Sequence, residues 1–409
     1  MTNLLWPGDH RAGQHMTDQA LLDSMVAVES AWLGALAAAG LAPADCAWAD
    51  LSKLLIRDDC ESLAVAAEDG GNPVIGLVEL LRQRAAPAIA PWIHRGLTSQ
   101  DVLDSSLMLA VRAVVDDLAS QLKEQISTLA ELATLHRATP MVARTLTQQA
   151  APTTFGAKAA GWLNGIVDAV ERLGALITPI QIGGAAGTWA ATTELATLLT
   201  DAADPAKVSA DLVHTVAAVL GLDVRLPWHT TRTPVTAGAD AFVGCTDCWG
   251  RIASDIVTLV RPEIAELSEP AGENRGGSSS MPHKRNPVLS ILIRRAAMSA
   301  PQLAATLHAA AALANDERPD GAWHAEWDNL RTLGRRTVVA GSQCGELLAG
   351  LAVHSEKMAE NLNAADVFGE QRVIAELAGK APSATYFGAV DRLIDESLDR
   401  AQVVLGQRL

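Results

Sequence analysis

The sequence predicts an all-α protein built from long helices. Hydrophobic residues make up 49% of the 409 residues, but aromatic residues make up only 4%. Strand-rich proteins favour aromatic and β-branched residues, whereas this chain is rich in Ala and Leu, which favour helices. The segment 101–139 also contains neither Gly nor Pro. A chain of this length exceeds what one core usually serves, so we expect three helical domains, at 1–100, 101–350 and 351–409.

The segment 101–139 is the strongest helix prediction. Apolar residues recur along it in steps of three and four, which places them on one helical face. They are Leu103, Leu107, Val111, Val114, Leu118, Leu122, Ile126, Leu129 and Leu132. A helix of this length would extend about 58 Å, which a small domain cannot cover. We therefore expect a bundle of long helices that assembles with other subunits into a tetrameric helical core.

The remaining elements follow from the spacing of Gly and Pro. Further helices are predicted over 153–178, 207–220, 237–266, 288–315 and 327–351. The first hundred residues contain more Pro and Gly, so shorter helices are expected there. Two glycine-containing breaks, 179–188 and 262–287, are predicted to be loops. A break as long as the second is unusual in a compact helical protein and tends to be functional.

Composition excludes several classes of function. The formal net charge is −15, and no Lys/Arg-rich run could neutralise phosphates, so nucleic acid is not an expected partner. The N-terminus lacks the pattern of a signal peptide, and no run of about 18 apolar residues predicts a membrane span. A cytoplasmic protein is expected. A site for an anionic substrate must then be a local cluster of positive groups inside a negative protein.

Cysteine and histidine patterns do not predict a metal site. The five cysteines follow no disulfide framework, which suits a reducing compartment. Cys245 and Cys248 form a C-x-x-C without a second Cys/His pair, so we interpret them as buried helical thiols. The histidines show no metal-ligand spacing.

Polar residues interrupt the helical pattern at two places in the first half. In His94–Asp101, Thr98 and Ser99 are N-cap candidates for the long helix. They either only start that helix or, with His94 and Arg95, form an anion site at its N-terminus. Ala143–Thr154 is interpreted as a solvated connection between two helices.

A third polar stretch, Gly276–Pro287, reads GGSSSMPHKRNP. Its first half resembles a flexible linker, but linkers do not usually continue into such a sequence and then a helix. The glycines supply mobility and the serines supply hydroxyls. Lys284 and Asn286 supply donors, and Pro287 is placed to begin the next helix. The stretch is therefore predicted to be a functional loop within 270–287.

These stretches resemble a known family. GSSSMPHKRNP resembles the signature loop of the fumarase/aspartase superfamily, and HRGLTSQDVLDSS and ARTLTQQAAPTTFG resemble its other two segments in the same order. PIQIGGAAGTWA and ERPDGAWHAEWDNL resemble the bacterial 3-carboxy-cis,cis-muconate cycloisomerases. The resemblance covers about residues 1–360. It implies a homotetramer in which three subunits share each active site, one segment from each.

The resemblance also implies roles for individual residues. Ser278 corresponds to the catalytic acid/base, and Lys284 and Asn286 correspond to groups that bind substrate carboxylate. The candidate substrate-binding residues are His94, Arg95, Thr98, Ser99, Arg144, Gln149, Ser279, Met281 and His283. For His324 and Glu326 in WHAEW, a role in the site and a role at a subunit contact stay open.

Two departures from the family indicate the type of reaction. Gln149 stands where adenylosuccinate lyases carry a histidine, and Ile291 stands where lyases and fumarases carry its glutamate partner. A His–Glu pair protonates a leaving amine or activates water. A carboxyl group has a pKa near 4, so it attacks or leaves without such help. The departures therefore favour an internal carboxylate nucleophile.

The expected function is lactonisation of 3-carboxy-cis,cis-muconate to 4-carboxymuconolactone, a step in protocatechuate-type aromatic catabolism. The reaction needs no metal and no cofactor. Three alternatives stay open. They are a 3-sulfomuconate cycloisomerase, an argininosuccinate- or adenylosuccinate-type lyase, and a catalytically silent structural homologue.

Overall fold

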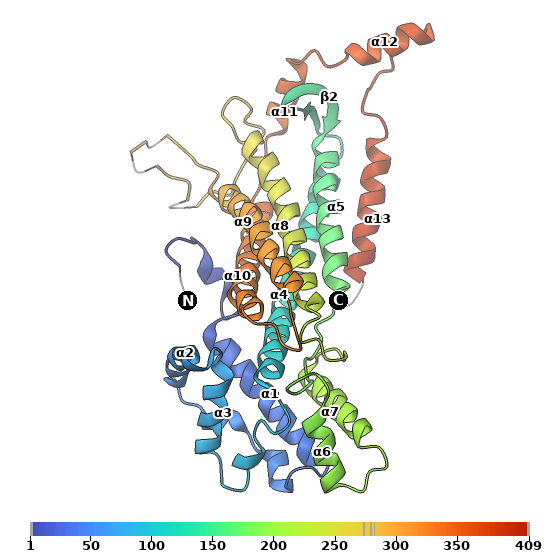
Figure 1. The fold of residues 1–409 in the computed structure, drawn as a ribbon. Helices are drawn as coiled ribbons and strands as arrows, with labels where there is room; N and C mark the ends of the chain where they lie inside the picture. The colour runs from blue at the N-terminus through green and yellow to red at the C-terminus, as the bar shows by residue number, and fades with distance from the viewer. Residues whose placement is uncertain (1–2, 273–274, 279, 282, 407–409) are drawn as a thin grey trace.

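A computed structural model describes residues 3–272, 275–278, 280–281 and 283–406. Within these residues the chain forms 13 α-helices and two small two-stranded sheets (Figure 1). The prediction of a mainly helical protein is confirmed. The strands were not predicted.

Five long helices form the central bundle. They are α4 (Ser99–Leu135), α5 (Phe155–Gly174), α8 (Thr233–Leu259), α9 (Val288–Ala312) and α10 (Ala322–Ala349). The apolar residues predicted for one face of α4 are largely buried, with Leu107, Leu118 and Leu129 at 2% exposure or less. This face joins the main hydrophobic core.

Several helix ends differ from the prediction, each for a local reason. α4 ends at Leu135 rather than at 139, because the ring of Pro140 clashes with the carbonyl of residue 136 in a continued helix. α8 ends at Leu259 rather than at 266, because Pro262 follows and Ala265 adopts a left-handed φ of 52°. α10 begins at Ala322, directly after Gly321, rather than at 327.

A second group of helices packs at the lower end of the bundle in Figure 1. It contains α1 (Asp18–Ala38), α2 (Asp59–Gly70), α3 (Pro73–Arg84), α6 (Ala190–Leu199) and α7 (Pro205–Leu220). Short 3-10 helices connect them, at Asp9–Ala12 (η1), Ala44–Trp48 (η2), Leu51–Leu54 (η3) and Ala90–Trp92 (η4). α1 has 21 residues, longer than expected for this part of the chain. α6 and α7 come from mid-chain, so residues beyond the first hundred also build this region. The domain limits at 100 and 350 stay predictions.

The opposite end of the bundle carries the strands and the C-terminal helices. β1 (Pro140–Thr145) and β2 (Gln148–Thr154) form an antiparallel hairpin, where the sequence had predicted only a solvated connection. Leu146 and Thr147 at its tip both have positive φ, as a tight hairpin turn requires. Such turns usually contain Gly or Asn, so the sequence lacked the expected hairpin signal.

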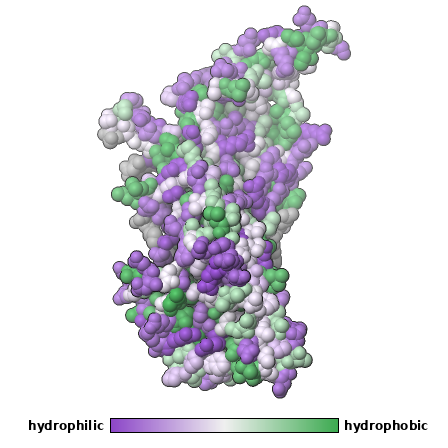
Figure 2. All heavy atoms as spheres, viewed as in Figure 1, coloured by the Kyte–Doolittle hydropathy of each residue, from purple (hydrophilic) through white to green (hydrophobic). Residues whose placement is uncertain are grey.

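The chain's last elements complete this end. β3 (Leu267–Ser268) pairs with β4 (Ala352–Val353), and α11 (Ser355–Asn363), α12 (Gly369–Ala378) and α13 (Val390–Gly406) follow. α13 packs along α5, whereas α12 stands away from the bundle (Figure 1). Apolar side chains gather over α12 in Figure 2, where Val373, Ile374 and Leu377 are more than half exposed.

One helix, α1, is long and apolar enough to cross a membrane by length and composition alone. Half of its apolar window is buried inside the protein, and it packs against α4 and α7. It also carries Glu29, which is fully buried. These contacts are those of a core helix.

Candidate active site

The signature loop between α8 and α9 is closed at its neck by Gly276 and Asn286. The backbone N–H of Asn286 donates to the Gly276 carbonyl at 2.8 Å, and its side-chain amide donates to the same oxygen at 3.1 Å. Gly276 has a φ of +72°, and a Cβ there would lie 2.6 Å from the Asn286 carbonyl oxygen. Only glycine fits this position without displacing the neck.

Ser278 lies just beyond this neck, and its hydroxyl oxygen faces backbone donors. Ser278 Oγ accepts hydrogen bonds from the N–H groups of Met281 at 3.2 Å and Ser280 at 3.4 Å. N–H groups in this arrangement stabilise negative charge on the oxygen, which a serine acting as an acid or base requires. Ser279, a predicted binding residue, lies outside the described residues.

The rest of the loop presents cationic groups to solvent. His283, Lys284 and Arg285 are exposed, and Met281 is 41% exposed. Neither Lys284 nor Arg285 has a carboxylate partner among the described residues, so their charges are available to an anionic substrate. In a chain with a net charge of −15, such a local cluster is what an anion site needs.

The base of the loop is anchored to other elements. Glu346 on α10 pairs with Arg275 and, at 2.6 Å, with Arg11 of the N-terminal segment. Burial raises the pKa of Glu346, but hydrogen bonds from Arg11 and Arg275 outweigh it and hold the pKa below its ordinary value. Glu269 accepts the N–H groups of Leu289 and Ser290 and so occupies the N-terminus of α9.

The first of the three family segments, HRGLTSQDVLDSS, contains the start of α4, as the sequence predicted. Thr98 is the N-cap, and its backbone N–H donates to Asp101 at 3.0 Å in a capping box. Asp101 is fully buried and also accepts the N–H groups of Gly183 at 2.8 Å and Gly184 at 2.9 Å. The glycine-containing loop 179–188 is thereby held against the start of α4.

The predicted residues beside Thr98 point in different directions. His94 and Ser99 line a cavity of about 540 Å³ between α3 and α4. Arg95 instead turns back to the carbonyl of Pro91. Arg318, which the sequence analysis did not single out, donates a hydrogen bond to the Thr98 hydroxyl. The sequence could have suggested Arg318 as a site residue, because it lies within the cycloisomerase-like stretch ERPDGAWHAEWDNL.

The second family segment, ARTLTQQAAPTTFG, forms most of the hairpin. Its arginine, Arg144, is already paired with a carboxylate of this chain. Arg144 forms two hydrogen bonds with the fully buried Glu266, at 2.7 and 3.1 Å. Gln149 pairs with Arg144 across the hairpin and is exposed. Arg144 therefore ties the hairpin to the base of the signature loop rather than presenting a free charge in this structure.

The WHAEW stretch at the start of α10 forms a buried ionic cluster. Arg232 donates to Asp104 at 2.7 and 3.0 Å and to Glu326 at 2.6 to 3.1 Å, and all three side chains are 0–1% exposed. Trp323 also donates to Asp104 at 2.9 Å. Burial raises the pKa of Glu326 against the opposing charge of Arg232. His324 instead contacts the Gly71 carbonyl at 3.0 Å. Glu326 thus has a structural role within this chain.

One chain does not bring the three segments together. The first lies at the start of α4 and the second follows its end, so the 37 residues of α4 separate them by about 55 Å. The second and third lie at the same end of the bundle, joined by Arg144 and Glu266 (Figure 1). A site that uses all three segments requires further copies of the chain.

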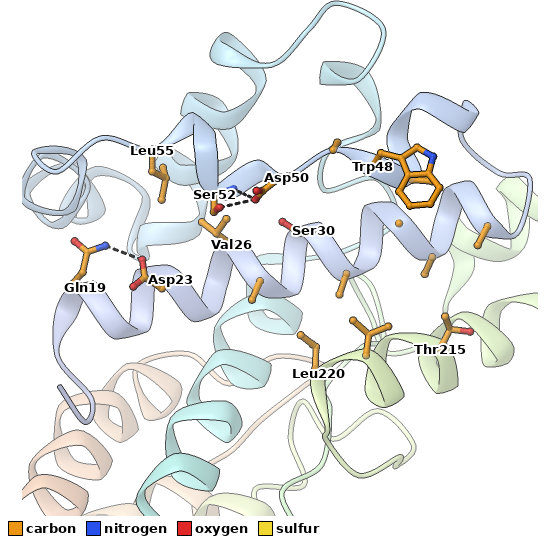
Figure 3. Close-up of a pocket in the computed structure, with 18 of the residues that line it drawn as sticks. Gln19, Asp23, Val26, Ser30, Trp48, Asp50, Ser52, Leu55, Thr215 and Leu220 are labelled. Atoms are coloured by element: carbon orange, nitrogen blue, oxygen red, sulfur yellow. Dashed lines mark hydrogen bonds between the residues drawn. The ribbon is translucent and has the colours of Figure 1, made fainter. Parts of the chain in front are cut away.

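A further cavity lies away from these motifs. It measures about 1350 Å³ and is formed by α1, the η2–η3 segment and α7. Val26, Trp48, Leu55 and Leu220 line it (Figure 3). It contains none of the candidate site residues and is mainly apolar, so it does not suit a polyanionic substrate.

Comparison with known proteins agrees with the fold. A family described as lyase matches residues 18–301. Nitrosuccinate lyase from Streptomyces davaonensis is 43% identical over 399 residues, covering 94% of this chain and 82% of that protein. The 3-carboxy-cis,cis-muconate cycloisomerase of Bradyrhizobium diazoefficiens is 39% identical over 355 residues, covering 85% and 76%.

Solved structures give the same result. The 3-carboxy-cis,cis-muconate lactonizing enzyme of Pseudomonas putida superposes with a TM-score of 0.77 at 29% identity, covering 97% of this chain and 88% of that one. A fumarate lyase from Mesorhizobium gives a TM-score of 0.75 at 26% identity, covering 97% of both chains. The chain therefore belongs to the fumarase/aspartase superfamily of lyases, with 3-carboxy-cis,cis-muconate cycloisomerases among its relatives.

Proposed function

We propose that this enzyme is a cycloisomerase that closes 3-carboxy-cis,cis-muconate to 4-carboxymuconolactone. The observation that carries the proposal is the signature loop, which combines Ser278, surrounded by backbone donors, with the unpaired cations Lys284 and Arg285. The substrate carries three carboxylates, and fixed cations and donors stabilise the charge that develops during such a reaction.

In the proposed mechanism, one substrate carboxylate oxygen forms a bond to an alkene carbon. The electron pair of that double bond moves toward the carbon next to another carboxylate, which becomes an enolate-like dianion. Ser278 donates its proton to that carbon and is left as an alkoxide, which the N–H groups of Ser280 and Met281 stabilise. The serine regains a proton from solvent when the loop opens. Lys284 and Asn286 bind the carboxylate on which charge accumulates.

The absence of a His–Glu pair at Gln149 and Ile291 supports this reaction. Gln149 is exposed at the hairpin, and Ile291 is 48% exposed on α9. Neither side chain can transfer a proton. A carboxylate nucleophile needs no such transfer, because it attacks in its ionised form at neutral pH. The held geometry of an internal attack supplies much of the remaining acceleration.

The proposal includes a homotetramer with shared active sites. The first segment lies about 55 Å from the second in one chain, so antiparallel copies must bring them together. Exposed apolar residues on α9 and α12, among them Ile291, Met298 and Leu377, are surfaces that another copy would cover. The proposed enzyme is cytoplasmic and uses neither a metal nor an organic cofactor.

A second candidate is the elimination of nitrite from nitrosuccinate. The supporting observation is the 43% identity with nitrosuccinate lyase across 94% of this chain. Nitrite, like a carboxylate, departs as the stable anion of an acid, so this reaction is also compatible with Gln149 and Ile291. Ser278 would then remove the proton from the neighbouring carbon instead of delivering one.

A parallel assay separates the candidates. Purified protein is added to 3-carboxy-cis,cis-muconate, 3-sulfomuconate and nitrosuccinate, with loss of diene absorbance and release of nitrite as readouts. Argininosuccinate and adenylosuccinate test the amine-eliminating alternatives through fumarate release. We expect turnover of carboxymuconate. Nitrite release alone would replace the first candidate with the second, and no turnover of any substrate would refute both.

A further inference from the structure

Two residues of α1 hold the turn that precedes the first segment. Glu29 Oε1 lies 2.6 Å from His94 Nδ1, and the indole N–H of Trp32 donates to the Arg95 carbonyl at 2.8 Å. Glu29 and Trp32 are three residues apart, so they lie on one face of α1, and both are at most 1% exposed. The turn is therefore fixed at two points from within the core.

The turn is strained as well as anchored. His94 has a φ of +61°, a left-handed conformation that is unfavourable for a non-glycine residue. Gly96 has a φ of +90°, and a Cβ there would lie 2.6 Å from Thr192 Cγ2. Such strain persists where the surrounding structure imposes it, and it gathers at functional sites.

Glu29 has an unusual environment for a carboxylate. Its side chain is 0% exposed, and its second oxygen, Oε2, has no hydrogen-bond partner among the described residues. Its ionic partner is His94. A buried carboxylate with so few partners is costly, and a well-packed apolar residue would be cheaper for folding alone. An ionised carboxylate only accepts hydrogen bonds, so the proton of this contact belongs to His94 Nδ1.

The other side of the imidazole faces an open space. His94 is 16% exposed and lines, with Ser99, the cavity of about 540 Å³. Glu79 and Arg82 of α3 also line this cavity, and Arg82 donates a hydrogen bond to the Ile93 carbonyl at 2.8 Å. Within the described part of the chain, Nε2 of His94 has no hydrogen-bond partner. It is therefore free to contact a ligand at the N-terminus of α4.

We propose that Glu29 is a positioning residue that holds His94 as a fixed donor, with Nδ1–H directed to Glu29 and Nε2–H to a substrate carboxylate. This rests on the proposed function, which assigns the first segment to the active site. The bound ligand is a polycarboxylate, and the imidazole of His94 lies between two carboxylates, one from the protein and one from the substrate. The site thus has a His–Glu pair that serves binding, formed by His94 of the first segment and Glu29 of α1. The His–Glu pair that other family members carry at the positions of Gln149 and Ile291 is missing.

The test uses a ligand that neither candidate reaction can consume. Tricarballylate, a saturated tricarboxylate, is titrated calorimetrically into the wild type, Glu29→Gln, His94→Gln and the double variant. We expect each single variant to bind about tenfold more weakly, and the double variant to bind no more weakly than His94→Gln. Effects that multiply in the double variant, or unchanged binding by Glu29→Gln, overturn the proposal. So does a wild type that does not bind tricarballylate.

Magic-angle-spinning NMR of the ¹⁵N-histidine-labelled protein adds a readout that a purely structural role would not produce. The His94 signals are assigned by their loss in His94→Gln. With tricarballylate bound, both ring nitrogens of wild-type His94 should carry protons. A wild-type spectrum with no proton on Nδ1 overturns the proposal, whichever substrates the enzyme turns over.

Two further variants serve as controls. Asp240→Asn changes the exposed His308–Asp240 pair, whose side chains are 51% and 58% exposed, and should leave binding unchanged. If Glu29→Gln does not fold, Glu29→Asp withdraws the carboxylate by one methylene and keeps the charge. Because tricarballylate binding needs no turnover, failure of both candidate reactions refutes the proposed function without deciding the role of Glu29.

Discussion

Replacing Arg232 by Met should destabilise the protein strongly. Arg232 is the single cation between Asp104 and Glu326 within the described structure, and all three side chains are almost fully buried. Removing one partner of a buried ion pair costs about 3–5 kcal/mol, and here one substitution leaves two carboxylates facing each other. A loss of about 5 kcal/mol corresponds to a Tm lower by roughly 6 °C in a chain of this size.

The assay is thermal unfolding followed by tryptophan fluorescence, since Trp228 stacks on Arg232 and Trp323 hydrogen-bonds to Asp104. Arg392→Met is the matched control. Arg392 is 81% exposed and, within the part of the chain that the structure describes, pairs only with Glu396 on its own helix, which predicts a change in stability of less than about 0.5 kcal/mol. Equal Tm shifts in the two variants would refute the reasoning.

The loss of stability in Arg232→Met, which we call its deficit, should also depend on pH and should be larger at high pH than at low pH. Burial already raises the pKa of Glu326, and Arg232 opposes that rise. Without Arg232 the folded-state pKa of Glu326 rises further above its unfolded value. The penalty is then full above the folded pKa and is relieved as pH falls through it. A deficit that stays constant between about pH 8 and pH 5 would show that Glu326 does not titrate in that range, which would contradict this prediction.

Three further predictions concern the signature loop and the hairpin. Ser278→Ala should lower kcat about 10²- to 10⁴-fold, the range for a positioned acid or base, and leave Tm within about 1 °C; near-normal turnover would remove Ser278 from the mechanism. Gly276→Ala should lower kcat at least tenfold, because its Cβ would meet the Asn286 carbonyl at 2.6 Å, whereas the control Gly277→Ala meets nothing within 4 Å and should be mild. Arg144→Gln should lower stability by about 3 kcal/mol in urea unfolding, because it leaves Glu266 buried without its cation; a loss below 1 kcal/mol would contradict the structural role of this pair.

The sequence by itself determined the helical character of the chain. Apolar spacing over 101–139 predicted α4 almost completely. A helix that buries one face along its whole length has apolar residues that recur in the sequence with a period of 3.6 residues. Thr98 and Ser99, the N-cap candidates, predicted the start of α4, because local capping depends only on neighbouring residues. The loop Gly276–Pro287 could be singled out because its run of small and polar residues interrupts that period.

Other features depend on contacts between residues far apart in the sequence, and only the tertiary structure decided them. The hairpin at Leu146–Thr147 carries no Gly or Asn signal. Arg144 looked like a substrate ligand until its partner Glu266, more than a hundred residues away, was seen to neutralise it. Glu29 is one of three acidic residues in α1, with Asp18 and Asp23, and nothing in the sequence marks it as the buried one.

The candidate site shows the same division. Residue types and spacing placed Ser278, Lys284 and Asn286 in one loop, because chemistry carried by a short segment is visible in that segment. How the three segments relate in space was decided by the length of α4, which keeps the first segment about 55 Å from the second. Periodicity shows that a helix is long and which face it buries, but only the packed structure shows which loops its two ends hold apart.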